Sequence, residues 1–239
     1  MYTFFLAFLL FSCFNAKAAE PQLVTPLTDT FVEALSPDYS GNGRLDYLKV
    51  QETSINLSIT FLMFDLSGVS HVSNTSLEAK LRLRTIYARS PFKVGARWCV
   101  NNNWNEDTLT FADLSSFYRT QPENIIIVSP GNAWYEWTVT DFVRTAVREK
   151  YEKITLAMEA NETNEGNFIA MFYSKDQQDL SLNDYRPQLV FTYQANGGVS
   201  SDMTGKVILA MLATVGIVFV AYRFLKKSAK KRRRSSSVR

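Results

Sequence analysis

LEAKLRLR, residues 77–84, alternates apolar and polar side chains without interruption. Its apolar positions are Leu77, Ala79, Leu81 and Leu83, and its polar positions are Glu78, Lys80, Arg82 and Arg84. Successive side chains of a β-strand point to opposite faces of the sheet, so one face of this segment lies against a core and the other meets water. The stretch therefore predicts a half-buried strand.

Short strand-like segments continue on both sides of this stretch, separated by turn signals such as SPDYSGNG (36–43). Further strands are expected at residues 47–50, 57–64, 92–97, 125–128, 136–139, 154–160, 168–173 and 188–193. Only TDFVRTAVREK, residues 140–150, is typical of a helix, with Thr140 as its N-cap and Phe142, Val143 and Val147 facing inward. We predict an all-β domain over residues 25–194, a jelly-roll β-sandwich with one short helix.

The two ends of the chain look like targeting segments. Residues 1–18 combine a short apolar run with a small-x-small cleavage pattern, Ala16-Lys17-Ala18, which is typical of a signal peptide. Near the other end, residues 195–206 read as a stalk, and Val207–Leu225 is an apolar run long enough for a transmembrane helix. The basic tail at residues 226–239 has no acidic residue, so the positive-inside rule predicts that it is cytoplasmic.

Charge is divided unevenly along the chain. Nine of the 26 basic residues lie from Arg223 onward and Lys17 lies in the leader, so residues 19–206 carry 16 basic and 23 acidic residues, a net charge of −7. An acidic domain is not expected to bind nucleic acid. We expect the basic tail to contact anionic lipids of the inner leaflet, and phosphorylation at Ser235 or Ser236 would weaken that attraction.

The sequence offers little support for catalysis. His71 is the one histidine, so a nucleophilic triad would have to use it. Glu106 and Asp107 are neighbours, and adjacent residues of an extended chain point apart rather than toward one substrate atom. No cofactor is expected and no metal site is identified, although a structural calcium ion on loop carboxylates near Asp38 or Asp176 stays open.

Two kinds of modification site remain to be considered. Once Cys13 leaves with the signal peptide, Cys99 has no partner within the chain, which favours a buried free thiol over a bond to another chain. Asn56, Asn74 and Asn161 each begin an Asn-x-Ser/Thr sequon, so we expect a glycoprotein.

Several motifs, in one order along the chain, resemble the DNRLRE domain family. They are DTFV at 29–32, NG at 42–43, FLMFDLS at 61–67 followed by LEAKLRL at 77–83, WNEDTLTF at 104–111, WTVTDFV at 137–143, FYSKD at 172–176 and RPQLVFTY at 186–193. Phe111 stands where that family usually has tryptophan. A weaker similarity, carried by FDLS and WTVTDFV, is to the arm domain of propeptides of the transforming-growth-factor-β type, but no cystine-knot domain follows.

The resemblance implies an extracellular jelly-roll module. Some members bind carbohydrate, acidic polysaccharides such as alginate among them. Most of the matched positions look structural. We expect core positions at Phe61, Met63, Leu81, Leu83, Trp137 and Val139. Asp65 and Ser67 would cap a turn, Arg186 would anchor a loop, and Glu106 would fix the backbone of its own loop.

The polar face of the 77–84 strand is the best candidate for a ligand site. Lys80, Arg82 and Arg84 form a basic row about 13 Å long at the rise of a strand. Guanidinium groups suit carboxylates and sulfates, so the row fits an acidic polysaccharide, and Arg97 would extend it. Aromatic residues at loop ends could stack on sugar rings, namely Trp104, Tyr118, Tyr135 and Tyr185. Two alternatives stay open, that the row is a solvated face paired to Glu78 and neighbouring strands, and that Trp104 belongs to the core.

We therefore predict a type I single-pass protein of the plasma or surface membrane, with its N-terminus outside. Its sandwich would recognise extracellular polysaccharide or another glycan in adhesion, without catalysis. The alternative is a module for protein–protein interaction, such as an envelope or receptor subunit. A polysaccharide-degrading enzyme is the third hypothesis, and it requires two convergent carboxylates in a cleft.

Overall fold

The computed structural model describes residues 20–69, 77–162 and 166–193. These residues belong to one compact unit, Lys17–Ala195. The expected signal peptide, His71, the sequon at Asn74, the span Val207–Leu225 and the tail with Ser235 and Ser236 lie outside the described residues. Within the described ranges, no helix combines the length and the apolar character needed to cross a membrane.

Strands make up most of the described secondary structure, which confirms the all-β prediction. They are β1 (Gln22–Val24), β2 (Thr28–Glu33), β3 (Tyr47–Glu52), β4 (Leu57–Asp65), β5 (Leu77–Ala88), β6 (Phe92–Cys99), β7 (Asn124–Val128), β8 (Trp134–Thr138), β9 (Lys153–Ala160), β10 (Phe168–Tyr173) and β11 (Gln188–Tyr193). The helical elements are α2 (Thr140–Arg148) and three short 3-10 helices, η1 (Gly41–Arg44), η2 (Ala112–Ser116) and η3 (Leu180–Tyr185).

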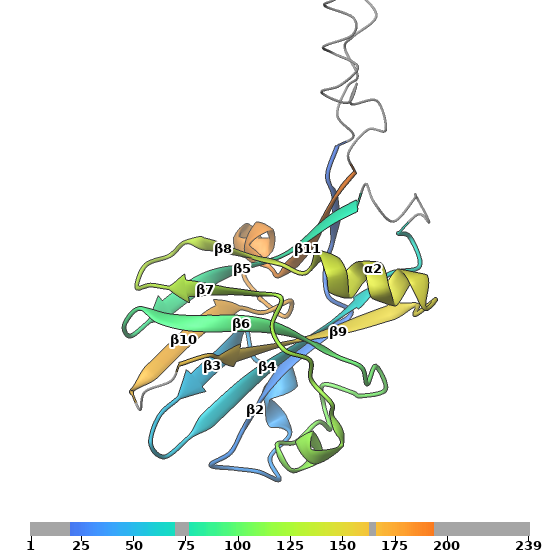
Figure 1. Cartoon of the computed structure of the whole chain (residues 1–239). Helices are drawn as coiled ribbons and strands as arrows, with labels where there is room; N and C mark the ends of the chain where they lie inside the picture. Colours follow the sequence, from blue (N-terminus) through green and yellow to red (C-terminus); the bar gives the residue numbers. More distant parts are fainter. Residues whose placement is uncertain (1–19, 70–76, 163–165, 194–239) are drawn as a thin grey trace, which may run out of the picture. The chain divides into compact units, whose positions relative to one another are not determined.

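The strands form one curled antiparallel sheet in the order β1-β11-β5-β10-β3-β4-β9-β6-β7, with β2 on β4 and β8 on β5. The long strand β5 makes the sheet continuous. Its first part lies between β8 and β11, and its last residues pair with β10 across a break in register. Figure 1 shows β8, β5 and β11 on one side of the domain and β3, β4 and β2 on the other.

The main core lies inside the curl. The inward residues of β5 are buried while Glu78, Lys80, Arg82 and Arg84 are partly exposed, which confirms the alternation read from the sequence. All six expected core residues, Phe61, Met63, Leu81, Leu83, Trp137 and Val139, are buried. Trp137 donates its indole N–H to the carbonyl of Val94 at 2.8 Å, so this buried polar group is satisfied and β8 is tied to β6.

The predicted helix is present as α2, with Val143 and Val147 buried on the core side. The prediction that Thr140 caps it is wrong, because Val139 occupies the N-cap position. The Glu123 carboxylate accepts from the first-turn amides of Asp141 and Phe142 instead. Thr140 instead exchanges hydrogen bonds with the backbone of Ala79, its hydroxyl lying 3.0 Å from the amide nitrogen and 3.2 Å from the carbonyl oxygen. The hydroxyl thus docks the start of α2 on β5.

Candidate functional site

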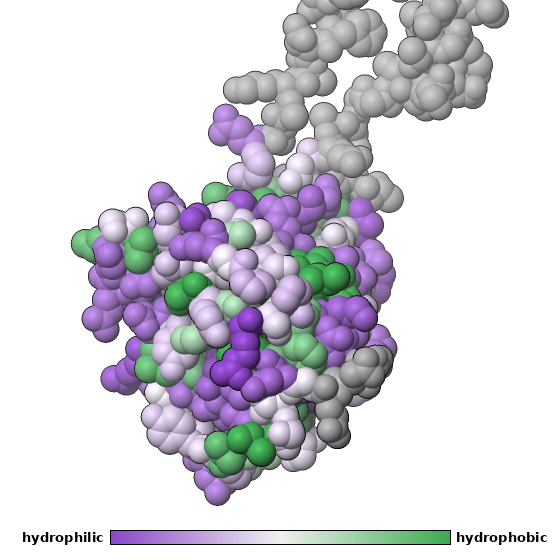
Figure 2. Space-filling model, turned by 90° about the vertical axis from the view of Figure 1, so that its left-hand side faces the viewer, coloured by the Kyte–Doolittle hydropathy of each residue, from purple (hydrophilic) through white to green (hydrophobic). Residues whose placement is uncertain are grey.

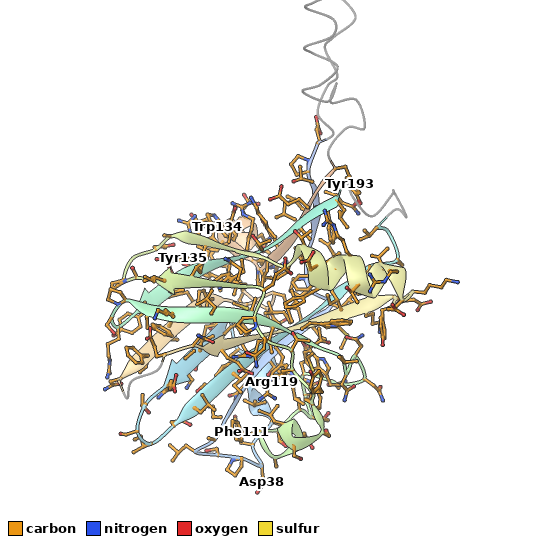
Figure 3. All side chains as sticks on the ribbon, viewed as in Figure 1. Asp38, Phe111, Arg119, Trp134, Tyr135 and Tyr193 are labelled. Atoms are coloured by element: carbon orange, nitrogen blue, oxygen red, sulfur yellow. The ribbon has the colours of Figure 1, made fainter. Side chains whose placement is uncertain are left out.

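The outer surface of β8, β5 and β11 gathers cationic and aromatic side chains. We call it the basic face and define it by Lys80, Arg82, Arg84, Trp134, Glu136, Tyr185 and Gln188. Strand register puts Arg82 opposite Glu136 on β8 and opposite Gln188 on β11. Arg84 lies opposite Trp134, which Figure 3 shows on β8. Tyr185 comes from the end of η3.

The Arg82 guanidinium contacts three neighbouring side chains. Its Nε lies 2.9 Å from a Glu136 carboxylate oxygen, and its Nη1 donates to Gln188 Oε1 at 3.2 Å. Its guanidinium lies over the Trp134 ring, 4.7 Å from the centroid. Because a carboxylate, an amide oxygen and an aromatic ring all contact this guanidinium, Arg82 organises the face rather than serving as a free ligand contact.

Arg84 is held differently. Its guanidinium lies 3.7 Å from the Tyr185 ring centroid, and its Nε donates to Asn132 Oδ1 at 2.6 Å. Its two Nη groups have no protein partner among the described residues. The Tyr185 ring and one hydrogen bond thus hold this guanidinium, while its terminal N–H groups can donate to both oxygens of a carboxylate.

Local carboxylates offset part of the positive charge. Lys80 Nζ lies 3.3 Å from Glu78 and 3.8 Å from Glu136. Three cations face two carboxylates, which leaves a small positive excess on an acidic domain. The alternative of local pairing is therefore correct for Lys80 and Arg82, and Arg84 carries the unpaired charge.

Arg97 does not join the basic face. It lies on β6, where its Nε is 3.0 Å from Glu159 of β9 and its Nη1 donates to the carbonyl of Thr120 at 3.0 Å. Arg119 pairs with the same carboxylate. Figure 3 shows Arg119 well away from Trp134. This group holds the segment before β7 against β6 and β9.

Among the expected sugar-stacking residues, Trp104 packs in a second apolar cluster outside the main core. Its indole N–H donates to Thr155 Oγ1 at 3.0 Å, and its ring meets Phe61 edge-on with centroids 6.2 Å apart. Tyr118 is 72% exposed, next to Arg119 rather than on β8 or β5. The structure therefore does not bring either aromatic to the basic face.

An acidic cluster connects three distant parts of the chain. Asp29, Glu106 and Asp176 each place a carboxylate oxygen within 4.8 Å of the others. Lys175 puts its ammonium 3.1 Å from Glu106 Oε1 and 2.8 Å from Asp176 Oδ2, so the chain itself supplies the positive charge that a calcium ion would bring. Despite the lowering effect of burial, these hydrogen bonds raise the pKa of Lys175.

Asp29 is the buried member of this acidic cluster. Its two oxygens accept hydrogen bonds from Ser174 Oγ and the Lys175 amide, each at 2.8 Å. Burial raises the pKa of Asp29 to about 7, although both hydrogen bonds and Lys175 act in the opposite direction. Glu106 accepts from the Asp29 amide at 3.1 Å and from Thr28 Oγ1 at 2.6 Å, so the expectation that it fixes its own loop is wrong. It fixes the start of β2.

Within this cluster, Lys175 Nζ is hydrogen-bonded to Glu106 and Asp176. As expected, Glu106 and Asp107 diverge, since Asp107 pairs with the exposed Arg44. A pocket lies elsewhere, between the turn after β4 and the end of α2. Its lining residues are Leu66, Ser67, Val69, Val147, Lys150, Tyr151 and Glu152. It holds one carboxylate, so it lacks the acid/base pair that glycoside hydrolysis needs.

The modification sites in the described ranges differ in accessibility. Asn56 is buried, and its Nδ2 donates to Glu33 at 3.1 Å, so a glycan there would displace this bond. Asn161 is half-buried, with Oδ1 3.3 Å from Arg97 Nη2. Cys99 is buried and free, as expected. The predicted anchors are also present: Asp65 accepts from the Ser67 amide at 2.8 Å, and Arg186 donates to the Gln177 carbonyl at 3.2 Å.

Sequence reasoning missed Trp134, Glu136 and Gln188 as parts of the site. The strand at 136–139 was expected, but its start at Trp134 and its pairing with β5 carry no local signal. Tyr185 was expected as a possible sugar-stacking residue, but its contact with Arg84 was not expected. Opposite charge on Arg82 and Glu136 is the one sequence signal compatible with cross-strand pairing.

Comparison with protein families gives one match. The model described as carbohydrate-binding module family 96 covers residues 20–193, the whole of the described domain and most of the chain. The name differs from that of the resemblance drawn from the motifs, while its carbohydrate-binding component agrees. No curated protein matches the chain.

Proposed function

The chain belongs to carbohydrate-binding module family 96, and on this premise we propose that its domain binds an acidic polysaccharide through the basic face. The observation that carries the proposal is Arg84. Its guanidinium is oriented by Tyr185 and Asn132, and its terminal donors have no protein partner among the described residues. Because the guanidinium is oriented before binding, less side-chain entropy is lost when the ligand binds.

Carboxylate groups are the favoured anchors on the ligand. A uronate carboxylate matches the two parallel Nη–H donors of a guanidinium, which a neutral hydroxyl cannot do. Lys80, Glu136 and Gln188 lie further along the same face, around Arg82, and offer donors and acceptors for sugar hydroxyl groups. The Trp134 and Tyr185 rings lie against the guanidinium groups of Arg82 and Arg84, with centroids 4.7 and 3.7 Å away.

Binding without catalysis is the mode of action that we propose. The family is one of binding modules. In the described ranges, the convergent carboxylates lie around Lys175, and the pocket beside α2 has a single carboxylate. These observations support recognition, whereas hydrolysis would require a carboxylic acid and a carboxylate across one sugar bond.

We also propose the setting predicted from the ends of the chain. The domain would be carried outside the cell by a cleaved leader and held by Val207–Leu225, with the basic tail inside on anionic lipids. The apolar run and the tail without acidic residues support this proposal.

A glycan-binding assay with residues 20–193 tests the function. Polyuronates, sulfated glycans and neutral glucans should be compared by calorimetry at one ionic strength. We expect the domain to bind polyuronates. Arg84→Gln should lower the affinity for polyuronates about tenfold or more, because one charge-assisted bidentate contact is lost. Arg44→Gln is the matched control, since Arg44 is exposed and pairs only with Asp107. Equal binding by both variants would refute the assignment to the basic face.

A second function, protein–protein interaction, has one observation in its favour. Leu35 and Ile55 are 66% and 76% exposed, and the Leu35 amide donates to Asn56 Oδ1 at 3.0 Å, so the two apolar residues lie at neighbouring loops. Figure 2 shows apolar residues only in small separate patches on the side it presents, which favours a glycan ligand. Oligomerisation abolished by Leu35→Ser with Ile55→Ser would support the protein ligand.

A further inference from the structure

The connection between β10 and β11 links the acidic cluster to the basic face. We define the β10–β11 loop as residues 174–187. It starts at Ser174 and Lys175, both bonded to Asp29, and it contains η3, whose last residue is Tyr185. The residue that Asp29 anchors and the residue that orients Arg84 therefore belong to one short loop.

The start of this loop is held by buried contacts. Asp29 is 1% exposed and receives both the Ser174 hydroxyl and the Lys175 amide. Ser174 Oγ also accepts from the Asp176 amide at 3.1 Å, and Lys175 Nζ binds Glu106. Two acceptors on one carboxylate thus fix two successive residues of the loop against β2.

The end of the loop is coupled back to its start. The Tyr173 and Tyr185 rings pack with centroids 5.3 Å apart, and Tyr173 directly precedes Ser174. Arg186 bonds the Gln177 carbonyl, and Asp179 accepts from the Ser181 amide at 2.9 Å at the start of η3. Tyr185 then supports the Arg84 guanidinium at 3.7 Å. Ring contacts thus connect Tyr173 to Tyr185 and Tyr185 to Arg84.

We propose that Asp29 is a positioning residue for glycan recognition, acting through the β10–β11 loop on Tyr185 and Arg84. The proposal rests on the proposed function for its effect on ligand affinity. Its structural part, that Asp29 sets the order of η3 and Tyr185, does not need a ligand.

The first experiment measures that structural part on ligand-free residues 20–193. Asp29→Asn keeps the shape of the side chain. The amide has one acceptor oxygen, whereas the carboxylate has two, one for Ser174 and one for Lys175. We expect faster amide hydrogen exchange over residues 177–186, where Leu182 and Arg186 donate to Asp179 and Asn183. Ser58→Ala is the control, because it removes a buried hydrogen bond to Glu33 without touching the loop. Unchanged exchange in Asp29→Asn would overturn the proposal.

The second experiment is a double-mutant cycle on polyuronate affinity. Asp29→Asn should weaken binding about fivefold, and Tyr185→Ala should weaken it at least as much. In the Tyr185→Ala background, Asp29→Asn should have no further effect, since its route to Arg84 has been removed. In a Tyr185→Phe background, Asp29→Asn should again weaken polyuronate binding, because the aromatic ring remains. Additive losses would show a general stability effect and reject the proposal.

Failure of the proposed function and failure of the positioning role of Asp29 give different results. If wild-type protein binds no glycan, the proposed function fails, and hydrogen exchange still decides whether Asp29 orders the loop. If wild-type protein binds and Asp29→Asn neither loosens residues 177–186 nor weakens binding, the positioning role fails while the proposed function stands.

Discussion

Asp29 makes the stability of the domain depend on pH in an unusual direction. Burial raises its pKa from 3.8 to about 7, so between these values the folded state holds a proton that the unfolded state has lost. The free energy of unfolding therefore falls as pH rises across that window, by at most about 1.4 kcal/mol per pH unit. Urea titrations at pH 5.5 and 7.5 should show the lower stability at pH 7.5.

Asp29→Asn isolates this contribution. The groups around Asp29 are Lys175, Asp176 and Glu106, and burial also raises the pKa values of Glu52 and Glu123 in the same direction. We expect the variant to be less stable at pH 5.5 but to have a flatter profile up to pH 7.5. A profile as steep as that of the wild type would mean that Asp29 is charged in the folded state.

Trp137 offers a stability test that separates the two faces of β8. Trp137→Phe removes the donor to Val94 and leaves a buried carbonyl and a small void, so we expect a loss of about 2–4 kcal/mol in denaturant unfolding. Trp134→Phe, three residues earlier on the outer face, should cost less than about 1 kcal/mol while weakening glycan binding. The reverse order of stabilities would contradict the burial of Trp137.

Residue-scale roles were predictable where a local pattern or a family motif decided them. The alternation of residues 77–84 placed Leu81 and Leu83 in the core, and the family resemblance implied the turn at Asp65 and Ser67 and the burial of Trp137. Trp104 was not decidable, because its half-buried position depends on Thr155, which is 51 residues away. The role of Trp134 was not predicted for the same reason, since its partner Arg82 comes from another strand.

At the scale of elements, the tight approach of η1 to the loop holding Glu106 predicts a specific glycine requirement. A Cβ at Gly43 would overlap the Glu106 backbone carbonyl, and Glu106 in turn holds the start of β2. We expect Gly43→Ala to destabilise the domain by about 1–3 kcal/mol in thermal or denaturant unfolding.

Gly68→Ala is the matched control for Gly43→Ala. The nearest atom to a Cβ at Gly68 is Gln22 Nε2 at 3.7 Å, which is ordinary contact distance. That variant should unfold like the wild type. Equal stability of the two alanine variants would show that η1 can move away from Glu106 at little cost.

Elements were predictable when a periodic pattern spanned enough residues. β5 and α2 meet that condition, and both were located within a few residues. Their pairing was not predictable, because the order β8-β5-β11 pairs residues at least fifty positions apart. Thr140 illustrates the limit: its residue type suits a helix cap, yet tertiary contact with Ala79 uses its hydroxyl instead.

At the scale of the molecule, the pairing of β1 with β11 brings the two ends of the described domain together. Gln22 lies opposite Phe191, and the Tyr193 hydroxyl donates to Gln22 Oε1 at 3.3 Å. Figure 3 shows Tyr193 at one end of the domain and Asp38 at the other. A chain anchored through Val207–Leu225 would thus be attached to the domain through the end that carries Tyr193.

This arrangement gives a prediction about the full chain in cells. Because nine basic residues from Arg223 onward have no acidic neighbour, translocation of the tail is disfavoured and the domain should lie outside. Protease added to intact cells should remove an epitope in residues 20–193, while a tag after Arg239 should be digested only after permeabilisation. The protein should also resist alkaline extraction from membranes. Digestion of the tag on intact cells would reverse the orientation, and release by alkali would reject the span, whereas glycan binding by residues 20–193 would be unaffected by either result.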